Sequence, residues 1–316
     1  MVTYALFILG FIILIYGAKL LIDGASSLGI RAGLPQLIIG LSIVALGTSL
    51  PELVINVFAS VEGNTGLAIG NVLGSNIMNT LLIVGVTAMI YPIKVSTKVI
   101  KRDTLINMVA ILIMAVLAND FFFGKSTASI DQVDGIILLV LFVVLIYILF
   151  TDKSDTETDN DETDSLKSVP VSILLILAGI VGLFFGGRWI VDGATKIATD
   201  FGVSQSTIGL TLIAMATSLP ELVTSIIAAL SKKTDIAIGN ALGSNIFNIF
   251  LVLGTSAVIT PITFDTGLNV EIGILIGSSL FLLLLIIVGK SERTITRFEG
   301  VLLALCYLGF LTWSII

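Results

Sequence analysis

Two glutamates that lie inside long apolar runs are the residues most able to do chemistry. Glu52 and Glu221 each end the same five-residue string, Thr-Ser-Leu-Pro-Glu. An ionised side chain at the centre of a bilayer costs roughly 3 kcal/mol or more unless it is paired. Neither half of the chain offers a buried lysine or arginine at the matching position. A cation arriving from water is therefore the simplest partner for both carboxylates.

The proline before each glutamate predicts a break in the helix. Pro51 and Pro220 carry no backbone N–H, so they cannot donate to the carbonyl groups four residues earlier, those of Gly47 and Ala216. Unwound backbone survives in a membrane only where it is buried in protein or faces a wet cavity. The sequence therefore predicts that carbonyl oxygens line a cation site at both breaks.

Hydroxyl and amide side chains recur at helical spacing around these breaks. Thr48 lies four residues before Glu52, and Ser75 lies four residues before Asn79, so each pair shares one helix face. The second half repeats both spacings with Thr217, Glu221, Ser244 and Asn248. Oxygen ligands of this kind suit hard cations such as sodium and calcium, and they exclude soft-metal chemistry.

The same residue types also have structural uses. Glycine pairs four residues apart allow close helix packing, and they occur at Gly70 with Gly74 and at Gly239 with Gly243. Asparagines in apolar spans are as well suited to hydrogen bonding between helices as to ligation. This applies to Asn56, Asn71, Asn76, Asn240 and Asn245.

The elements that position these residues must be membrane helices. The chain has 316 residues, of which 56% are hydrophobic and 12% charged, too few polar side chains to cover a water-exposed globule. Its apolar runs are long enough for helices that cross about 30 Å of hydrocarbon. The sequence predicts an all-α integral membrane protein with ten transmembrane helices. The expected spans are residues 3–22, 35–60, 67–92, 103–119, 133–151, 169–190, 204–230, 236–262, 269–289 and 297–315.

The two halves of the chain are copies. A shift of 169 residues carries Thr48 to Glu52 onto Thr217 to Glu221, and it carries Gly74 to Ile77 onto Gly243 to Ile246. Each half has an odd number of crossings, so the second half enters the membrane from the opposite side, as an inverted repeat. We predict two inverted five-helix repeats, residues 1–151 and 169–316. The acidic segment 152–168 is expected to be a flexible linker.

Positive charges predict the orientation, because cytoplasmic loops collect lysine and arginine. Outside the spans, the side expected to face away from the cytoplasm holds only Lys125 and Lys196. Both termini are therefore expected outside, with the acidic linker in the cytoplasm, in a multi-pass cell-membrane protein. The first apolar run is expected to be a span and not a removable signal. The residues on the side expected to be cytoplasmic are Arg31, Lys94, Lys98, Lys101, Arg102, Lys153, Lys167, Lys232, Lys233, Lys290, Arg293 and Arg297.

Residue types that are absent or rare in the sequence exclude several classes of function. Histidine is absent, which removes the commonest zinc ligand and the usual proton shuttle. The one cysteine, Cys306, is expected to be a small buried core residue. An intramembrane hydrolase with Ser49 or Ser218 as nucleophile would have no base to activate it, so no enzyme activity and no cofactor are expected. The net charge of −6 is concentrated in the linker, so no nucleic-acid partner is expected, and no protein partner is implied.

Taken together, these motifs resemble the calcium/cation antiporter superfamily, in its sodium/calcium exchanger branch of prokaryotic type. The likeness covers essentially the whole chain. It rests on two paired signatures, Gly47 to Glu52 with Gly70 to Asn76, and Ala216 to Glu221 with Gly239 to Asn245. The resemblance implies a secondary active antiporter that exchanges sodium for calcium by alternating access.

The resemblance also implies a set of site residues. A central calcium site would use the carboxylates of Glu52 and Glu221 and the backbone carbonyls of Thr48 and Thr217. Asn79 and Asn248 would border the middle of the site. Two flanking sodium sites would be formed near Ala45, Thr48, Ser49 and Ser75, and near Ala214, Thr217, Ser218 and Ser244.

One departure from the family pattern bears on the coupling ion. Many relatives, the potassium-dependent ones included, carry aspartate where this chain has Asn248, so the site has two carboxylates. One calcium ion neutralises them, whereas three sodium ions leave one positive charge, which makes an electrogenic exchange of three sodium ions for one calcium ion the expected cycle. A potassium-dependent or proton-coupled exchanger is the alternative. A passive cation channel is a further reading, which the inverted repeat argues against.

Overall fold

The computed structural model describes residues 2–95, 102–119, 128–151, 166–200, 217–288 and 294–315. Within these ranges six helices are long and apolar enough to cross a membrane, and a bent pair, Gln36–Thr48 with Leu50–Val61, makes a seventh. The structure therefore confirms the predicted all-α membrane fold. The full count of ten spans stays a prediction, since residues 201–216 fall in a gap between the described ranges.

The helices of the first half follow the expected spans, with short breaks inside two of them. Their bounds are α1 Val2–Arg31, α2 Gln36–Ile39, η1 Gly40–Val44, α3 Ala45–Thr48, α4 Leu50–Val61, α5 Thr65–Met78, η2 Asn79–Ile83, α6 Val84–Ile90, α7 Thr104–Ala118 and α8 Gln132–Thr151. The segments η1 and η2 are single π-helical stretches that continue into regular helix.

The described helices of the second half repeat this order. Their bounds are α9 Val169–Asp200, α12 Leu219–Leu230, α13 Thr234–Phe247, η7 Asn248–Leu253, α14 Gly254–Ile259, η8 Thr266–Leu268, α15 Asn269–Val288 and α16 Arg297–Ile315. The segment η7 is again π-helical and η8 is a 3-10 turn.

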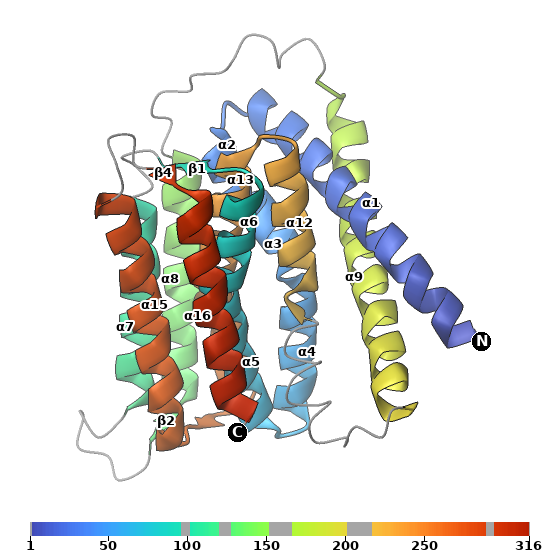
Figure 1. The fold of residues 1–316 in the computed structure, drawn as a ribbon. Helices are drawn as coiled ribbons and strands as arrows, with labels where there is room; N and C mark the ends of the chain where they lie inside the picture. Colours follow the sequence, from blue (N-terminus) through green and yellow to red (C-terminus); the bar gives the residue numbers. More distant parts are fainter. Residues whose placement is uncertain are drawn as a thin grey trace.

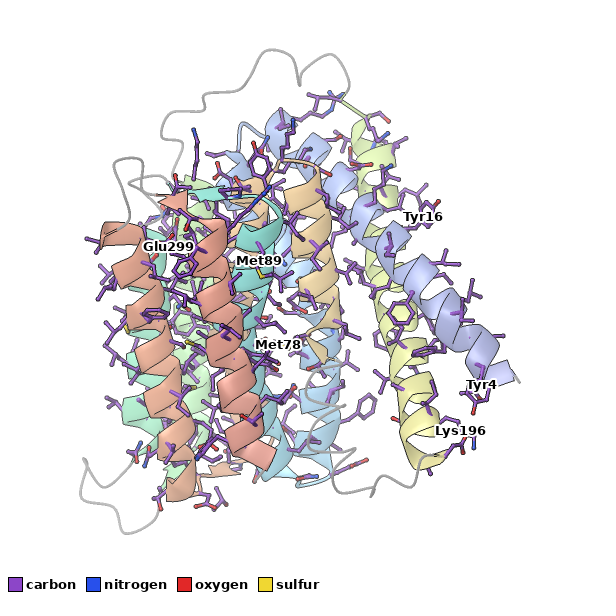
Figure 2. The ribbon with its side chains drawn as sticks, viewed as in Figure 1. Tyr4, Tyr16, Met78, Met89, Lys196 and Glu299 are labelled. Atoms are coloured by element: carbon purple, nitrogen blue, oxygen red, sulfur yellow. The ribbon has the colours of Figure 1, made fainter. Side chains whose placement is uncertain are left out.

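The long helices α1 and α9 lie against each other at one side of the bundle (Figure 1). A Cβ atom on Gly17 would come within 2.9 Å of the Leu183 amide nitrogen, so the two backbones are in contact. Where α1 begins and α9 ends, the Tyr4 hydroxyl donates to Asp200 Oδ2 over 2.6 Å and Lys196 Nζ donates to Asp200 Oδ1. Figure 2 shows Tyr4 and Lys196 at this same end. Close packing and this polar contact join the two helices into one unit.

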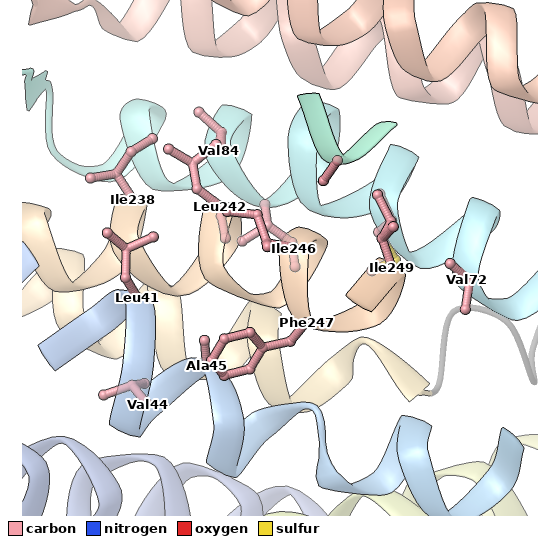
Figure 3. Packing of buried hydrophobic residues seen from close by; sticks show 14 of the residues in the cluster. Leu41, Val44, Ala45, Val72, Val84, Ile238, Leu242, Ile246, Phe247 and Ile249 are labelled. Carbon is pink, nitrogen blue, oxygen red and sulfur yellow. The ribbon is translucent and has the colours of Figure 1, made fainter. Parts of the chain in front are cut away.

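Helix α13 runs through the centre of the bundle. It packs along α2, η1 and α3, where Leu41 and Ala45 lie close to Leu242 and Phe247 (Figure 3). This close approach depends on small residues. The Cβ atom that any other residue would carry at position 243 would lie 2.7 Å from the Leu41 carbonyl oxygen.

The predicted packing role of the glycine pairs is therefore confirmed in the second half. A Cβ atom on Gly239 would lie 2.6 Å from the Leu37 carbonyl oxygen. In the first half, a Cβ atom on Gly70 or Gly74 meets no atom of the described residues within 4 Å. Residues 201–216 are outside the described ranges, so that half of the prediction stays open.

Two features differ from the expectation. Two antiparallel pairs of two-residue strands join the loops, β1 (Ile93–Lys94) with β4 (Thr294–Ile295) and β2 (Ser129–Ile130) with β3 (Ile262–Thr263). The expectation that Cys306 is buried is wrong, because its side chain is exposed on α16. Lipid tails are as apolar as a protein core, so a small apolar residue on a membrane helix gains little from burial.

Candidate cation-binding site

Both site-bearing spans break at the serine that precedes Leu-Pro-Glu. Ser49 and Ser218 leave the helical conformation, with φ and ψ of −85° and 1° and of −89° and 5°. In the first half the two helices on either side of the break differ in direction by 44°. Each proline then sits in the first turn of the next helix, where its missing N–H is not needed. The predicted interruption is confirmed, although the residues before Thr217 lie outside the described ranges.

The two glutamate side chains are buried at these breaks. Their exposed fractions are 1% for Glu52 and 0% for Glu221. The two carboxyl groups are close enough for their charges to repel each other. Neither forms an ion pair with any of the described residues. Both lie in the first turn of a helix, where the helix dipole favours negative charge. In the part of the chain that the structure describes, the two buried carboxylates thus have no basic side chain beside them.

The protein supports the two carboxylates unequally. Glu221 Oε1 accepts hydrogen bonds from Ser49 Oγ over 3.1 Å and from Ser244 Oγ over 3.4 Å. By contrast, both oxygens of Glu52 and the hydroxyl of Ser218 have no hydrogen-bond partner among the described residues. The repeat equates Ser49 with Ser218, so the sequence gives no sign of this difference. Glu52 is therefore the carboxylate with both oxygens available to a ligand.

Each site threonine hydrogen-bonds to an asparagine of the other half. Thr48 Oγ1 donates to Asn240 Oδ1 over 3.1 Å, and Thr217 Oγ1 donates to Asn71 Oδ1 over 3.0 Å. Asn240 Nδ2 lies within 3.3 Å of the Glu221 carbonyl oxygen and 3.0 Å of a serine hydroxyl on the same helix as Glu221. The sequence left Asn71 and Asn240 open between ligation and hydrogen bonding, and the structure shows them hydrogen-bonded across the two halves.

The asparagines expected at the middle of the site each begin a π-helical segment. Asn79 opens η2 and Asn248 opens η7. Asn248 Nδ2 donates to Asn76 Oδ1 over 3.1 Å, which leaves Asn248 Oδ1 without a hydrogen-bond partner among the described residues. Both polar atoms of Asn79 are also unpartnered there. Single π-turns often occur at functional sites, and no sequence pattern in this chain predicted them.

The structure brings most of the expected site residues together. Ser244 Oγ lies 3.4 Å from Thr48 Oγ1, and Ser75 Oγ lies 3.5 Å from Thr217 Oγ1. The Ala45 carbonyl already accepts from the Ser49 amide over 3.0 Å. Ala214 lies outside the described residues. The expected residues that are buried are Ala45, Thr48, Ser49, Glu52, Ser75, Asn79, Thr217, Ser218, Glu221, Ser244 and Asn248.

Comparison with known proteins identifies the family. The family profile described as "Sodium/calcium exchanger protein" matches residues 2–151 and 171–316. The chain belongs to this family. It is 30% identical to the sodium/calcium exchanger MaX1 of Methanosarcina acetivorans, over 98% of this chain and 97% of that protein. It is 35% identical to the inner membrane protein YrbG of Escherichia coli, over 81% of this chain and 80% of that protein.

A solved structure extends the comparison to the fold. The sodium-calcium exchanger NCX_Mj, soaked with 10 mM Na⁺ and zero Ca²⁺, superposes with a TM-score of 0.84 at 31% sequence identity. The match covers 98% of each chain. The family is one of antiporters, which agrees with the expectation that this chain is a transporter.

The hydrogen bonds across the two halves give a testable expectation for this exchanger-family member. Asn240→Ala removes three buried hydrogen bonds, with the Thr48 hydroxyl, the Glu221 carbonyl and a serine hydroxyl on the same helix as Glu221, which costs about 2 kcal/mol of stability. We expect a several-fold rise in the ion concentration needed for half-maximal flux, because Thr48 and Glu221 both lose their positioning contact. Thermal unfolding and vesicle flux measure the two effects. Asn56→Ala is the control, since Asn56 contacts Asn71 and Ala68 but no expected ligand.

Proposed function

We propose that this protein exchanges sodium for calcium across the membrane by alternating access, with Glu52 and Glu221 as the calcium-binding carboxylates. The observation that carries the proposal is the pair of buried carboxylates without a basic side chain among the described residues. The unpartnered oxygens of Glu52, Asn79 and Asn248 supply further ligands of the kind that hard cations prefer. Sodium and calcium would compete for these oxygens, so the empty and doubly charged site would not readily change sides.

The charge of the site supports an electrogenic cycle. Two carboxylates balance one calcium ion, whereas three sodium ions leave one positive charge to cross with each turnover. A membrane potential supplies about 2.3 kcal/mol for each charge moved through 100 mV. Asn248 adds an amide oxygen without charge, and this favours sodium over potassium as the coupling ion, because the potassium-dependent relatives carry aspartate there.

The ligand roles and the orientation follow from the same proposal. The backbone carbonyls of Thr48 and Thr217 complete the calcium site. Both termini face outward, the linker 152–168 lies in the cytoplasm, and the repeats 1–151 and 169–316 enter the membrane from opposite sides. The names of MaX1 and NCX_Mj as sodium/calcium exchangers support the choice of sodium and calcium as the transported ions. The residues proposed for sodium or the middle site are Ala45, Ser49, Ser75, Asn79, Ala214, Ser218, Ser244 and Asn248.

Calcium uptake by sealed vesicles that hold the purified protein tests the proposal. Uptake is expected when the vesicles are loaded with sodium and diluted into sodium-free buffer. An inside-positive potential is expected to speed it, because each turnover would carry one net positive charge out of the vesicle. Replacing internal sodium by potassium, or by a pH gradient alone, is expected to abolish uptake. Uptake driven equally well by potassium or protons assigns a different coupling ion. Calcium flux without any counter-ion indicates a channel.

Asn248→Asp tests the charge argument separately. The aspartate adds a third carboxylate beside Glu52 and Glu221 and removes the Nδ2 donor to Asn76. We expect calcium binding to persist, while flux becomes dependent on external pH or on potassium. Flux at several pH values, with and without potassium, measures the change, and Asn245→Asp, which alters an asparagine that donates to Thr80, serves as control. If Asn248→Asp behaves as wild type throughout, Asn248 does not belong to the site.

A further inference from the structure

The turn that joins α12 to α13 lacks two stabilising features of its counterpart in the first half, namely a glycine in the left-handed conformation and a helix cap. At the turn between α4 and α5, Gly63 adopts a left-handed φ of 73° and the Asn64 side chain caps α5 by accepting from the Leu67 amide. The shift of 169 residues equates these with Lys232 and Lys233. Lys232 keeps the left-handed conformation, with φ of 61°, which disfavours any residue with a Cβ atom.

The second missing feature is the helix cap. Lys233 occupies the N-cap position of α13 but makes no side-chain cap hydrogen bond. Asparagine is among the best N-cap residues, so the change forfeits a common source of helix stability. A cytoplasmic location accounts for positive charge at this turn but not for a lysine in a left-handed conformation. Strain of this kind is a reason to look for a function.

Lys233 reaches into a cavity of about 220 Å³ at the end of the bundle where α1 ends and α9 begins. Three segments line it, namely the last turns of α1, the residues that lead into α9, and the turn between α12 and α13. The ends of these helices lie together at the top of Figure 1. The polar residues of the lining are Asp23, Ser26, Ser27, Lys167 and Lys233.

Hydrogen bonds hold the Lys233 ammonium group and the backbone at Lys167, and neither lysine has an anionic partner among the described residues. Lys233 Nζ donates to Ser26 Oγ over 3.2 Å. The Arg31 guanidinium donates to the carbonyl oxygens of Lys167 over 2.8 Å and of Leu166 over 3.1 Å, which anchors the backbone at Lys167. Within the part of the chain that the structure describes, no carboxylate lies within ion-pair distance of either lysine.

We propose that this cavity binds a phosphate group, carried by a lipid headgroup or free in the cytoplasm. Two ammonium groups and the hydroxyls of Ser26 and Ser27 are donors that suit phosphate oxygens. The lining has two lysines against one aspartate, Asp23, so its net charge favours an anion. A bound phosphate would connect α1, the start of α9 and the turn before α13. The site is separate from the carboxylates proposed for transport and requires neither sodium nor calcium.

Thermal unfolding of the full-length protein in a neutral detergent, without sodium or calcium, tests the proposal. The probes are inorganic phosphate and dihexanoyl phosphatidylglycerol, with chloride at equal ionic strength as the reference. We expect a saturable rise in the unfolding midpoint of the wild-type protein with at least one probe. A response to the lipid alone assigns a headgroup, and a response to inorganic phosphate assigns the phosphate itself.

The repeat supplies matched variants. Lys232→Gly removes an equal charge from the same turn, and we expect it to raise the midpoint without ligand and to keep the phosphate response. Lys233→Met is expected to weaken binding roughly tenfold or more, as the loss of a charge-assisted hydrogen bond implies. The double variant Lys232→Gly with Lys233→Asn recreates the Gly63-Asn64 turn, so it should be more stable than wild type yet lose the response.

Three results would overturn the proposal. They are no response of the wild-type protein to either probe, an unchanged response in Lys233→Met, and an equal loss of response in Lys232→Gly and Lys233→Met. The last result would mean that the charge of the turn acts without a defined site. None of these measurements depends on ion exchange, so a failure of the proposed function would leave this test unaffected, and the converse also holds.

Discussion

Glu221→Gln is expected to lower sodium-driven calcium uptake roughly a hundredfold or more, a loss of about 2.7 kcal/mol or more in binding the transported ion. The change removes one of the two charges that would balance calcium. It keeps an oxygen at the position where Ser49 and Ser244 donate. Because replacing a buried charge by a neutral group of the same shape relieves a desolvation cost, the folded protein should be retained. Vesicle flux and thermal unfolding measure the two effects.

The matched comparison is Glu52→Gln, in which the lost charge had no hydrogen-bond partner among the described residues. We expect an equal loss of flux, since both carboxylates are needed for charge balance. Glu62→Gln is the control, because Glu62 is an exposed residue at the end of the helix that carries Glu52. Wild-type flux in Glu221→Gln would remove this residue from the transport site. A large loss in the Glu62 variant would show that the assay responds to surface charge.

Gly243→Val is expected to destabilise the protein by about 3 kcal/mol, the upper part of the usual range for overpacking. Even the first added atom would lie 2.7 Å from the Leu41 carbonyl oxygen and 2.8 Å from the Ala45 Cβ atom. The backbone at Leu41 cannot rotate away as a side chain could, so η1 and α13 must separate. Since Thr48 lies on α3, directly after η1, its contact with Ser244 should be lost and the ion response weakened. Thermal unfolding and the sodium dependence of flux measure both effects.

Gly273→Val on α15 is the control for this experiment. A Cβ atom there meets no described atom within 4 Å, so the same chemical change should alter stability little. If both variants lose stability equally, valine in a membrane helix is itself the cause. If Gly243→Val keeps wild-type stability and flux, the close approach of α13 to η1 is not needed for the site.

Local sequence patterns were sufficient to predict the helices and the breaks that precede the two glutamates. Apolar runs of about twenty residues require membrane helices because no water is present to satisfy an open backbone. Proline in the string Leu-Pro-Glu requires a break because it lacks an N–H, and the structure breaks at Ser49 and Ser218. The spacing of the glycines predicted close packing, which is present at Gly239 and Gly243.

The contacts that complete the site could not be read from those patterns. The two halves are copies in sequence, yet Glu221 accepts two hydroxyl hydrogen bonds and Glu52 accepts none from the described residues. Nothing in the spacing of Asn71 and Asn240 separates a ligand from a hydrogen-bond partner. The exposure of Cys306 was likewise missed, because the bilayer makes an apolar surface as favourable as an apolar core.

The sequence by itself determined that two carboxylates enter the membrane without a nearby basic residue, and that their helices break just before them. These properties depend on covalent structure and on residues a few positions apart. Only the tertiary structure decided which oxygens remain free, because Ser49 and Glu221, or Thr217 and Asn71, are more than 140 residues apart in the chain. Such pairs depend on how the two halves dock, and docking is set by side-chain volume at contacts such as Gly243 against Leu41.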